Sequence, residues 1–124
     1  MVNVIANKSL IGYTYLRIGG PAEWFAEPRN IHELRELISW ADEKNLSVRI
    51  IGAGSNILVA DEGVKGLVIS LKTACAAIEV NGTNIITGSA VMLPALAKKA
   101  ASSGLSGAEF CIGIPGTVGG ALQS

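Results

Sequence analysis

The stretch that decides the fold is SVRIIGAGSNILVA, residues 47–60. Its first five residues are rich in β-branched side chains and predict a strand, and the loop GAGSN is followed by a second short apolar run. Glycine adopts positive φ at little cost and has no side chain to block a ligand, so such a loop can turn successive backbone N–H groups toward one anion. The polar side chains of Ser55 and Asn56 add donors. The loop therefore predicts either a phosphate-binding nest or a sharp turn between strands.

Two familiar nucleotide-binding loops do not fit this stretch. The third glycine of a dinucleotide-binding fingerprint would fall on Ile57, where the sequence predicts no helix. A phosphate-loop hydrolase needs a Lys-Ser or Lys-Thr pair after the loop, and the sequence has none there. A metal site is not expected either, because His32 is the only histidine and the two cysteines, Cys75 and Cys111, lack metal-binding spacing. Both thiols are expected to be reduced and buried.

A second glycine-rich segment, CIGIPGTVGGALQS, occupies residues 111–124. It holds four glycines and a proline, more than a hairpin turn requires. Two such segments in one short chain favour a shared ligand that both of them line.

The remaining pattern predicts an α+β fold. Strands are expected over residues 23–27, 47–51, 67–71 and, as a hairpin around Asn81-Gly82, over 76–88. One helix is expected to begin after Asn30 as N-cap, with Glu33 as its third residue, and to stop near Asn45. Its apolar face is expected to comprise Leu34, Leu37, Ile38 and Ala41.

A second helix is expected from Leu93 to Ser103, with Pro94 in its first turn and Gly104 at its C-cap. The order of elements predicts two lobes that divide near residue 65, over residues 1–65 and 66–124. Because the chain stops within a glycine-rich loop, the second lobe is expected to be incomplete.

Three segments resemble the UDP-N-acetylenolpyruvoylglucosamine reductase family, also called UDP-N-acetylmuramate dehydrogenase. They are YTYLRIGGPAEWF at 13–25, IGAGSNILVAD at 51–61 and GAEFCIGIPGTVGGA at 107–121, in the family's order and spacing. The resemblance implies a fold of the vanillyl-alcohol oxidase type, in which two α+β lobes grip an extended FAD. It also implies a third, substrate-binding domain, which is expected to be absent from these 124 residues.

Carried onto this sequence, the resemblance implies which residues bind FAD. In the first loop, backbone amides would wrap the pyrophosphate, at Gly52, Ala53, Gly54, Ser55, Asn56 and Ile57. In the second, Thr117 would contribute a hydroxyl and glycines would give the backbone room; the implied residues are Gly113, Ile114, Pro115, Gly116, Thr117, Gly119, Gly120 and Ala121.

The resemblance also implies a reaction. In the family, NADPH reduces FAD, the flavin passes hydride to an enolpyruvyl group, and a serine assisted by an arginine and a glutamate supplies the proton. Those three residues follow the second glycine loop in family members, so no residue here is expected to be catalytic. The alternatives are a stand-alone flavin- or nucleotide-binding module and a non-catalytic remnant that self-associates.

The composition of the chain limits which classes of binding partner are expected. The 124 residues include ten basic and ten acidic side chains, so no broad positive field attracts nucleic acid. The first ten residues lack the features of a signal peptide and no apolar run reaches the roughly 18 residues of a membrane span, so a cytoplasmic location without membrane contact is expected. The mean hydropathy of +0.43 is high, and some apolar surface is expected to need a partner, either the missing C-terminal half or a second copy.

Overall fold

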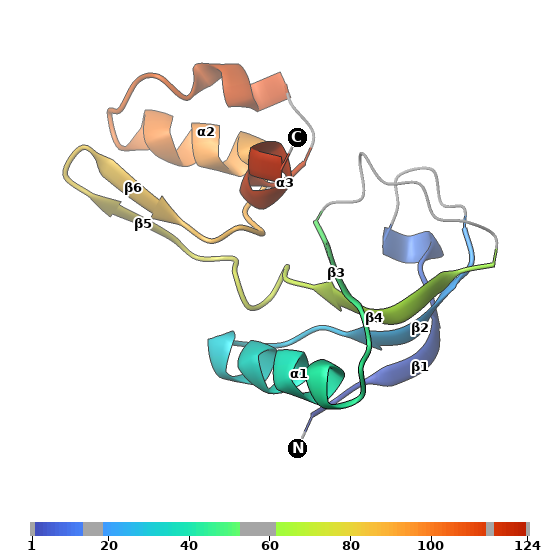
Figure 1. Ribbon diagram of the computed structural model, residues 1–124. Helices are drawn as coiled ribbons and strands as arrows, with labels where there is room; N and C mark the ends of the chain where they lie inside the picture. The colour runs from blue at the N-terminus through green and yellow to red at the C-terminus, as the bar shows by residue number, and fades with distance from the viewer. Residues whose placement is uncertain (1, 14–18, 53–61, 114–115, 124) are drawn as a thin grey trace.

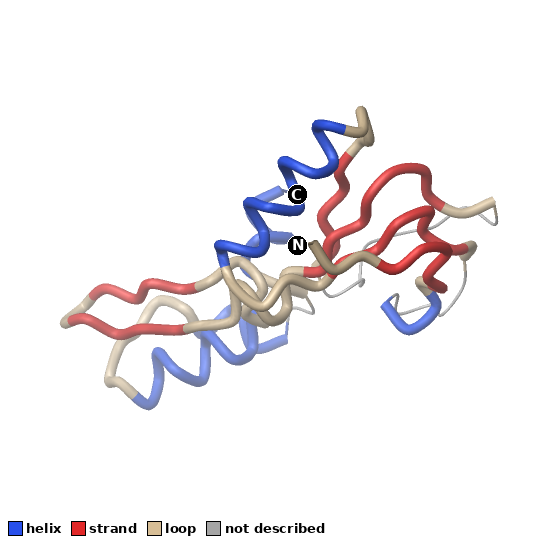
Figure 2. The backbone as a smooth tube through the Cα atoms, turned by 90° about the horizontal axis from the view of Figure 1, so that it is seen from below, coloured by secondary structure: helices blue, strands red, loops and turns tan. Residues whose placement is uncertain are grey.

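The computed structural model describes residues 2–13, 19–52, 62–113 and 116–123 (Figure 1). A four-stranded sheet, one covering α-helix and the short 3₁₀ helix η1 (Ile11–Tyr13) form the N-terminal part, and a hairpin with the later helices forms the C-terminal part. Figure 2 shows the sheet and the hairpin as separate groups of strands. No helix among these residues is long and apolar enough to cross a bilayer.

The four-stranded sheet has the order β1-β2-β4-β3. Its strands are β1 (Ile5–Ser9), β2 (Pro21–Ala26), β3 (Val48–Ile51) and β4 (Val64–Ser70). Strands β2, β3 and β4 are parallel, and β1 pairs antiparallel with β2. The last three strands confirm the expected ones within a few residues, whereas β1 was not expected because its sequence, IANKS, carries little apolar signal and most of it is exposed.

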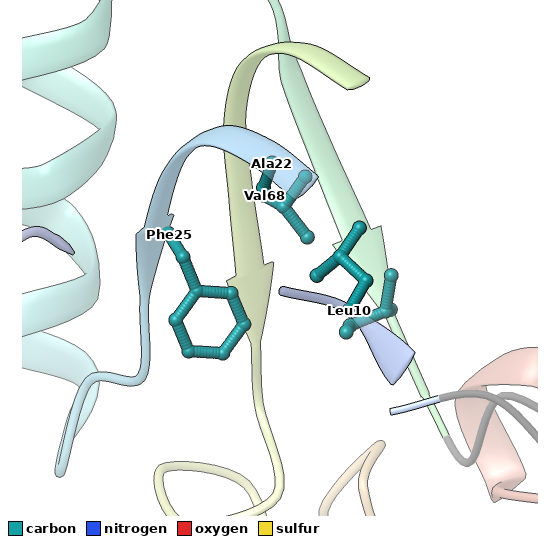
Figure 3. Packing of buried hydrophobic residues seen from close by; sticks show 5 residues of the cluster. Leu10, Ala22, Phe25 and Val68 are labelled. Carbon is teal, nitrogen blue, oxygen red and sulfur yellow. The ribbon is translucent and has the colours of Figure 1, made fainter. Parts of the chain in front are cut away.

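Strand β4 is the centre of the fold, since its side chains alternate between two cores. Val68 faces one cluster, with Leu10, Ala22 and Phe25 (Figure 3), while Leu67 and Ile69 face the other. A strand covered on both faces has a continuous apolar run, which explains why residues 66–70 are all buried.

Helix α1 (Ile31–Glu43) covers the second of these cores. Leu37 and Ala41 are buried and Leu34 is partly buried against the core, but Ile38 is 47% exposed. The expected apolar face was therefore right in three positions and wrong in Ile38. The part of the helix surface that the sheet covers is narrower than the apolar face predicted from the sequence.

The start and end of α1 confirm the predicted helix signals. The side chain of Asn30 accepts a hydrogen bond from the backbone N–H of Glu33 at 2.9 Å. The Glu33 carboxylate reaches back one residue further than in the usual capping box: it accepts from the backbone N–H of Arg29 at 2.8 Å and pairs with its guanidinium at 2.7 Å. Asn45 takes the left-handed conformation, φ 56°, just after the helix.

The Arg29–Glu33 pair predicts a pH dependence of stability. Hydrogen bonds from the side chain and backbone of Arg29 lower the pKa of the Glu33 carboxyl. A lowered folded-state pKa contributes stability above the unfolded-state pKa, about 4.3, and that contribution is lost as pH falls through the folded-state value. We expect Glu33→Gln to be less stable than the native chain at neutral pH, and the difference to shrink as the solution is acidified through that window.

Denaturant unfolding at a series of pH values measures this difference. Glu43→Gln, which removes an exposed carboxylate from the other end of the same helix, controls for the loss of one negative charge. A stability difference for Glu33→Gln that stays constant between neutral and strongly acidic pH would contradict the assignment.

The C-terminal part begins with the expected hairpin, β5 (Ile78–Asn81) and β6 (Asn84–Thr87). Asn81 pairs with Asn84, so the two-residue loop is Gly82-Thr83 and only Gly82 has a positive φ, 64°. A glycine with positive φ in the first loop position is typical of a type II′ turn. The hairpin is confirmed, with Asn81 placed at the end of a strand.

The second predicted helix is α2 (Leu93–Ser102), with Pro94 in its first turn. Ser103 is the C-cap, and Gly104, the predicted cap, follows it with φ 73°, so the glycine lies one position beyond the observed cap.

The last stretch differs from the glycine loop that was expected. It contains the 3₁₀ helix η2 (Glu109–Gly113) and the short helix α3 (Val118–Gln123). Glycine is a poor helix former, but the Thr117 hydroxyl caps α3 by accepting from the backbone N–H of Gly120 at 3.1 Å. Val118 and Cys111 also pack against Leu93 and Ala97 of α2. Capping and packing outweigh the low intrinsic helix propensity of this segment.

The sheet bears on the expected division near residue 65. Strand β4 runs across that position and pairs with β2 and β3 through Ser70. The two-lobe organisation stays a prediction, but a boundary that leaves the sheet intact must follow Ser70.

Candidate functional site

The two glycine-rich segments meet at Gly52 and Thr117. Gly52 directly follows β3, at the carboxyl end of the parallel strands, and Thr117 directly precedes α3. A Cβ atom placed on Gly52 would lie 2.7 Å from the Thr117 Oγ1 atom, closer than non-bonded atoms approach. Ligands of α/β sheets bind outside the carboxyl ends of parallel strands, which is where this contact lies.

The environment of Thr117 determines what its side chain can offer. The residue is only 5% exposed, and its Oγ1 accepts the hydrogen bond that caps α3. A hydroxyl has one proton to donate in addition to the lone pairs that accept. Thr117 can therefore keep its cap and still donate to an anion beside Gly52.

The backbone amides at the start of α3 have partners within the protein. Val118 donates to the carbonyl of Val91 and Gly119 to that of Ser89, both at 2.9 Å. Ala121 donates to the Thr117 carbonyl at 3.0 Å. With the Gly120 amide on the Thr117 hydroxyl, all four successive donors are used, so this turn does not present a row of free amides to a ligand.

Gly119 and Gly116 serve the chain's own backbone. A Cβ on Gly119 would lie 2.9 Å from the Cβ of Ser89, so this glycine lets α3 approach the segment before α2. Gly116 has φ 123°, a conformation that side chains rarely permit, and its carbonyl accepts from Leu93 N–H at 2.9 Å. The resemblance implies that Gly119 gives the protein backbone room to approach FAD, but in the structure the missing Cβ of Gly119 makes room for Ser89.

The structure places the other predicted binding residues as follows. Gly113 ends η2, and Gly120 and Ala121 lie on the exposed part of α3. A group of seven lies outside the described residues, so its role stays a prediction: Ala53, Gly54, Ser55, Asn56, Ile57, Ile114 and Pro115.

Sequence reasoning missed the part played by residues 89–93. Ser89, Val91 and Leu93 hold the second glycine segment through main-chain hydrogen bonds, and the Leu93 side chain also packs against Val118 and Cys111. Such bonds involve no particular side chain, so no motif could have revealed them. The one available signal is Gly88, because a Cβ there would overlap the Cys75 carbonyl oxygen.

Comparison with known proteins agrees with this geometry. Residues 22–124 match the model of a family described as FAD binding domain. The fold and the paired glycine segments thus define the class, a mixed α/β FAD-binding domain. Within that class, the chain belongs to the UDP-N-acetylenolpyruvoylglucosamine reductase family and corresponds to its N-terminal, FAD-binding portion.

Two relatives show the extent of the match. The chain is 49% identical over 118 residues to UDP-N-acetylenolpyruvoylglucosamine reductase of Prochlorococcus marinus (strain NATL2A), a match that covers 94% of this chain and 40% of the relative. It is 45% identical over 113 residues to the reductase of Synechococcus sp. (strain WH7803), covering 90% and 36%. The chain therefore spans about two fifths of the length of these relatives.

Solved structures support the same fold. UDP-N-acetylenolpyruvylglucosamine reductase from Thermus caldophilus superposes with a TM-score of 0.68 at 36% identity, over 98% of this chain and 41% of that one. 6-Hydroxy-D-nicotine oxidase from Arthrobacter nicotinovorans gives a TM-score of 0.61 at 16% identity, over 82% and 24%, which shows a shared fold alone.

Proposed function

We propose that this chain is the FAD-binding portion of an NADPH-dependent reductase that converts UDP-N-acetylglucosamine enolpyruvate to UDP-N-acetylmuramate in peptidoglycan synthesis. The observation that carries the proposal is the contact of Gly52 with Thr117, which joins the two glycine segments at the carboxyl end of a parallel sheet. Family membership supplies the identity of the cofactor.

The residues at this contact fit a dinucleotide. Gly52 is exposed and has no side chain, so an anionic group can approach its backbone, although the position that a Cβ would take is closed by the Thr117 Oγ1 atom at 2.7 Å. Thr117 is buried and caps α3, and its hydroxyl still has a proton to donate to a ligand. The residues that would hold FAD are those of the first loop, Gly52 to Ile57, and of the second segment, Gly113 to Thr117 with Gly119, Gly120 and Ala121.

The proposal gives this chain binding and orienting roles. When bound, FAD would supply hydride transfer between NADPH and the enolpyruvyl group. No residue here matches the family's proton-donating serine or its assisting arginine and glutamate, so the proposal assigns no catalytic residue to this chain. The relatives are more than twice as long, and the complete reaction belongs to a protein of that length. A cytoplasmic location is part of the proposal.

Exposed apolar side chains favour a second candidate function, a non-catalytic flavin-binding or self-associating module. Leu122 is 81% exposed, Ile112 65% and Ile86 61%. Exposed apolar side chains are typically covered by another polypeptide where they lie together in one patch. If they join two copies, sedimentation will report a concentration-dependent dimer; if they contact the rest of a reductase, the isolated chain will bind a separately expressed C-terminal portion instead.

Flavin titration tests the cofactor assignment. We expect the purified chain to bind FAD saturably, with a change in its visible absorption and fluorescence, and ADP to compete because it shares the pyrophosphate. Riboflavin, which lacks the pyrophosphate, should bind far more weakly. No NADPH oxidation with the enolpyruvyl substrate is expected from this chain alone. Absence of FAD binding at every concentration, or equal affinity for riboflavin, would refute the proposal.

A further inference from the structure

A short segment, Gly88–Leu93, runs antiparallel to residues 116–119 and holds them by three main-chain hydrogen bonds. Leu93 donates to Gly116, Val118 to Val91 and Gly119 to Ser89, each at 2.9 Å, and Met92 forms a bridge with Thr117. Thr117 therefore lies in the middle of a hydrogen-bonded strip. We call residues 88–93 the support segment.

The support segment is fixed on its other side to the chain that leaves β4. Gly88 donates to the Ala77 carbonyl at 2.8 Å and Ala90 to the Cys75 carbonyl at 2.9 Å. Cys75 itself donates to Leu71, the residue that follows β4, at 3.0 Å. Position 88 must be glycine for this approach, because a Cβ there would overlap the carbonyl oxygen of Cys75.

Both glycine segments of the candidate site are thus connected to the same end of strand β4. Ile51, which precedes Gly52, pairs with Ser70 at the end of β4. From the next residue, Leu71, hydrogen bonds lead through Cys75 and the support segment to Thr117, which then contacts Gly52. These contacts form a closed ring that begins and ends at the end of β4. The distance between the two glycine segments therefore depends on every hydrogen bond in the ring.

We infer that Gly88 and Ser89 are positioning residues for the cofactor site, and that the support segment sets the distance between Gly52 and Thr117. The inference rests on the proposed function for the identity of the ligand. The amides of residues 118–121 already have protein partners, so the second segment can offer a ligand only the Thr117 hydroxyl at this point. The support segment fixes the position of Thr117, and it therefore fixes the position of that hydroxyl.

Gly88→Ala tests the inference in the free chain. The new Cβ must push the support segment away from Cys75, so we expect the backbone amides of Val118 and Gly119 to exchange with solvent about tenfold faster or more. Amides of Val68 and Ile69 in β4 should keep their protection. Gly12→Ala is the matched control, since a Cβ there meets nothing within 4 Å.

Flavin binding provides a second measurement, the spectrum of the bound flavin, which a purely structural role of Gly88 would leave unchanged. Gly88→Ala should weaken FAD binding about tenfold or more, and at saturating FAD the visible circular dichroism of the bound flavin should differ from that of the native chain. A residue that served stability alone would lower the unfolding temperature and leave the saturated spectrum unchanged. That outcome, or unchanged exchange at Val118 and Gly119, would overturn the inference.

A second variant covers the case in which Gly88→Ala loses the protection of β4. Gly119→Ala presses on the same strip from the other side, against Ser89, and should give the same exchange and spectral changes. If the native chain and Gly12→Ala bind no FAD, the cofactor assignment fails, whereas the exchange rates still decide whether the support segment positions Thr117.

Discussion

Gly52→Val is expected to weaken FAD binding about 100-fold, equivalent to ~2.7 kcal/mol, while the four-stranded sheet stays folded. A Cβ on this residue already lies 2.7 Å from the Thr117 Oγ1, and the two γ-carbons of valine add bulk where the ligand would approach. Overpacking of a tight site typically costs about 1–3 kcal/mol. Thr117 is buried and caps α3, so it cannot rotate away without losing that hydrogen bond. Titration of FAD against each purified variant measures the effect.

A double-mutant cycle isolates the contact itself. Thr117→Ala removes the oxygen at 2.7 Å and the Cγ2 at 3.5 Å, leaving the Cβ at an ordinary 3.7 Å from a Cβ on Gly52. Gly52→Ala should therefore cost less stability and less FAD affinity in the Thr117→Ala background than in the native chain. Strictly additive effects would mean that the two glycine segments do not meet at this point.

Leu67→Ala is expected to lower the free energy of unfolding by about 2–5 kcal/mol, the usual range for a leucine truncated in a full core. Leu67 is fully buried in the central strand, where it pairs with Trp24 on one side and Val48 on the other. Its side chain packs in the cluster that includes Leu37 and Ala41 of α1. The cavity opens at the junction of three strands and a helix, which cannot all shift to fill it.

Tryptophan fluorescence follows this unfolding directly. The chain has two tryptophans, Trp24 and Trp40, and their rings meet edge to face 5.5 Å apart beside the same core. Ile38→Ala, on the exposed side of α1, is the control and should change stability by about 0.5 kcal/mol or less. Equal destabilisation by the two substitutions would show that Leu67 is not at the centre of the sheet's packing.

Local signals in the sequence predicted the elements that depend on few neighbouring residues. The cap of α1 needs only Asn30 and Glu33, three positions apart, and the β5–β6 turn needs only a glycine that accepts positive φ. The β-branched runs predicted β3 and β4. Strand β4 is apolar along its length because it is covered on both faces, whereas β3 is an edge strand with three exposed residues. The three family motifs predicted the FAD-binding family, which the comparisons confirm.

Elements that depend on distant partners were predicted less well. Strand β1 is mostly polar and exposed, and it exists because β2 offers an edge to pair with. Helix α3 contains two glycines, and it forms because the Thr117 cap and the packing of Val118 against α2 hold it. In both cases the stabilising contact lies in a partner element, so the local sequence carries little sign of it.

The sequence by itself determined that two glycine-rich segments exist, which residues compose them and which family they belong to. Only the tertiary structure decided that Gly52 touches Thr117, that Gly119 gives room to Ser89, and that the support segment holds the second loop. The physical reason is that caps, turns and apolar runs act through neighbouring side chains. The spacing of the two loops is instead set by main-chain hydrogen bonds between distant residues. Most side chains are compatible with such bonds, so no residue type in the sequence indicates them.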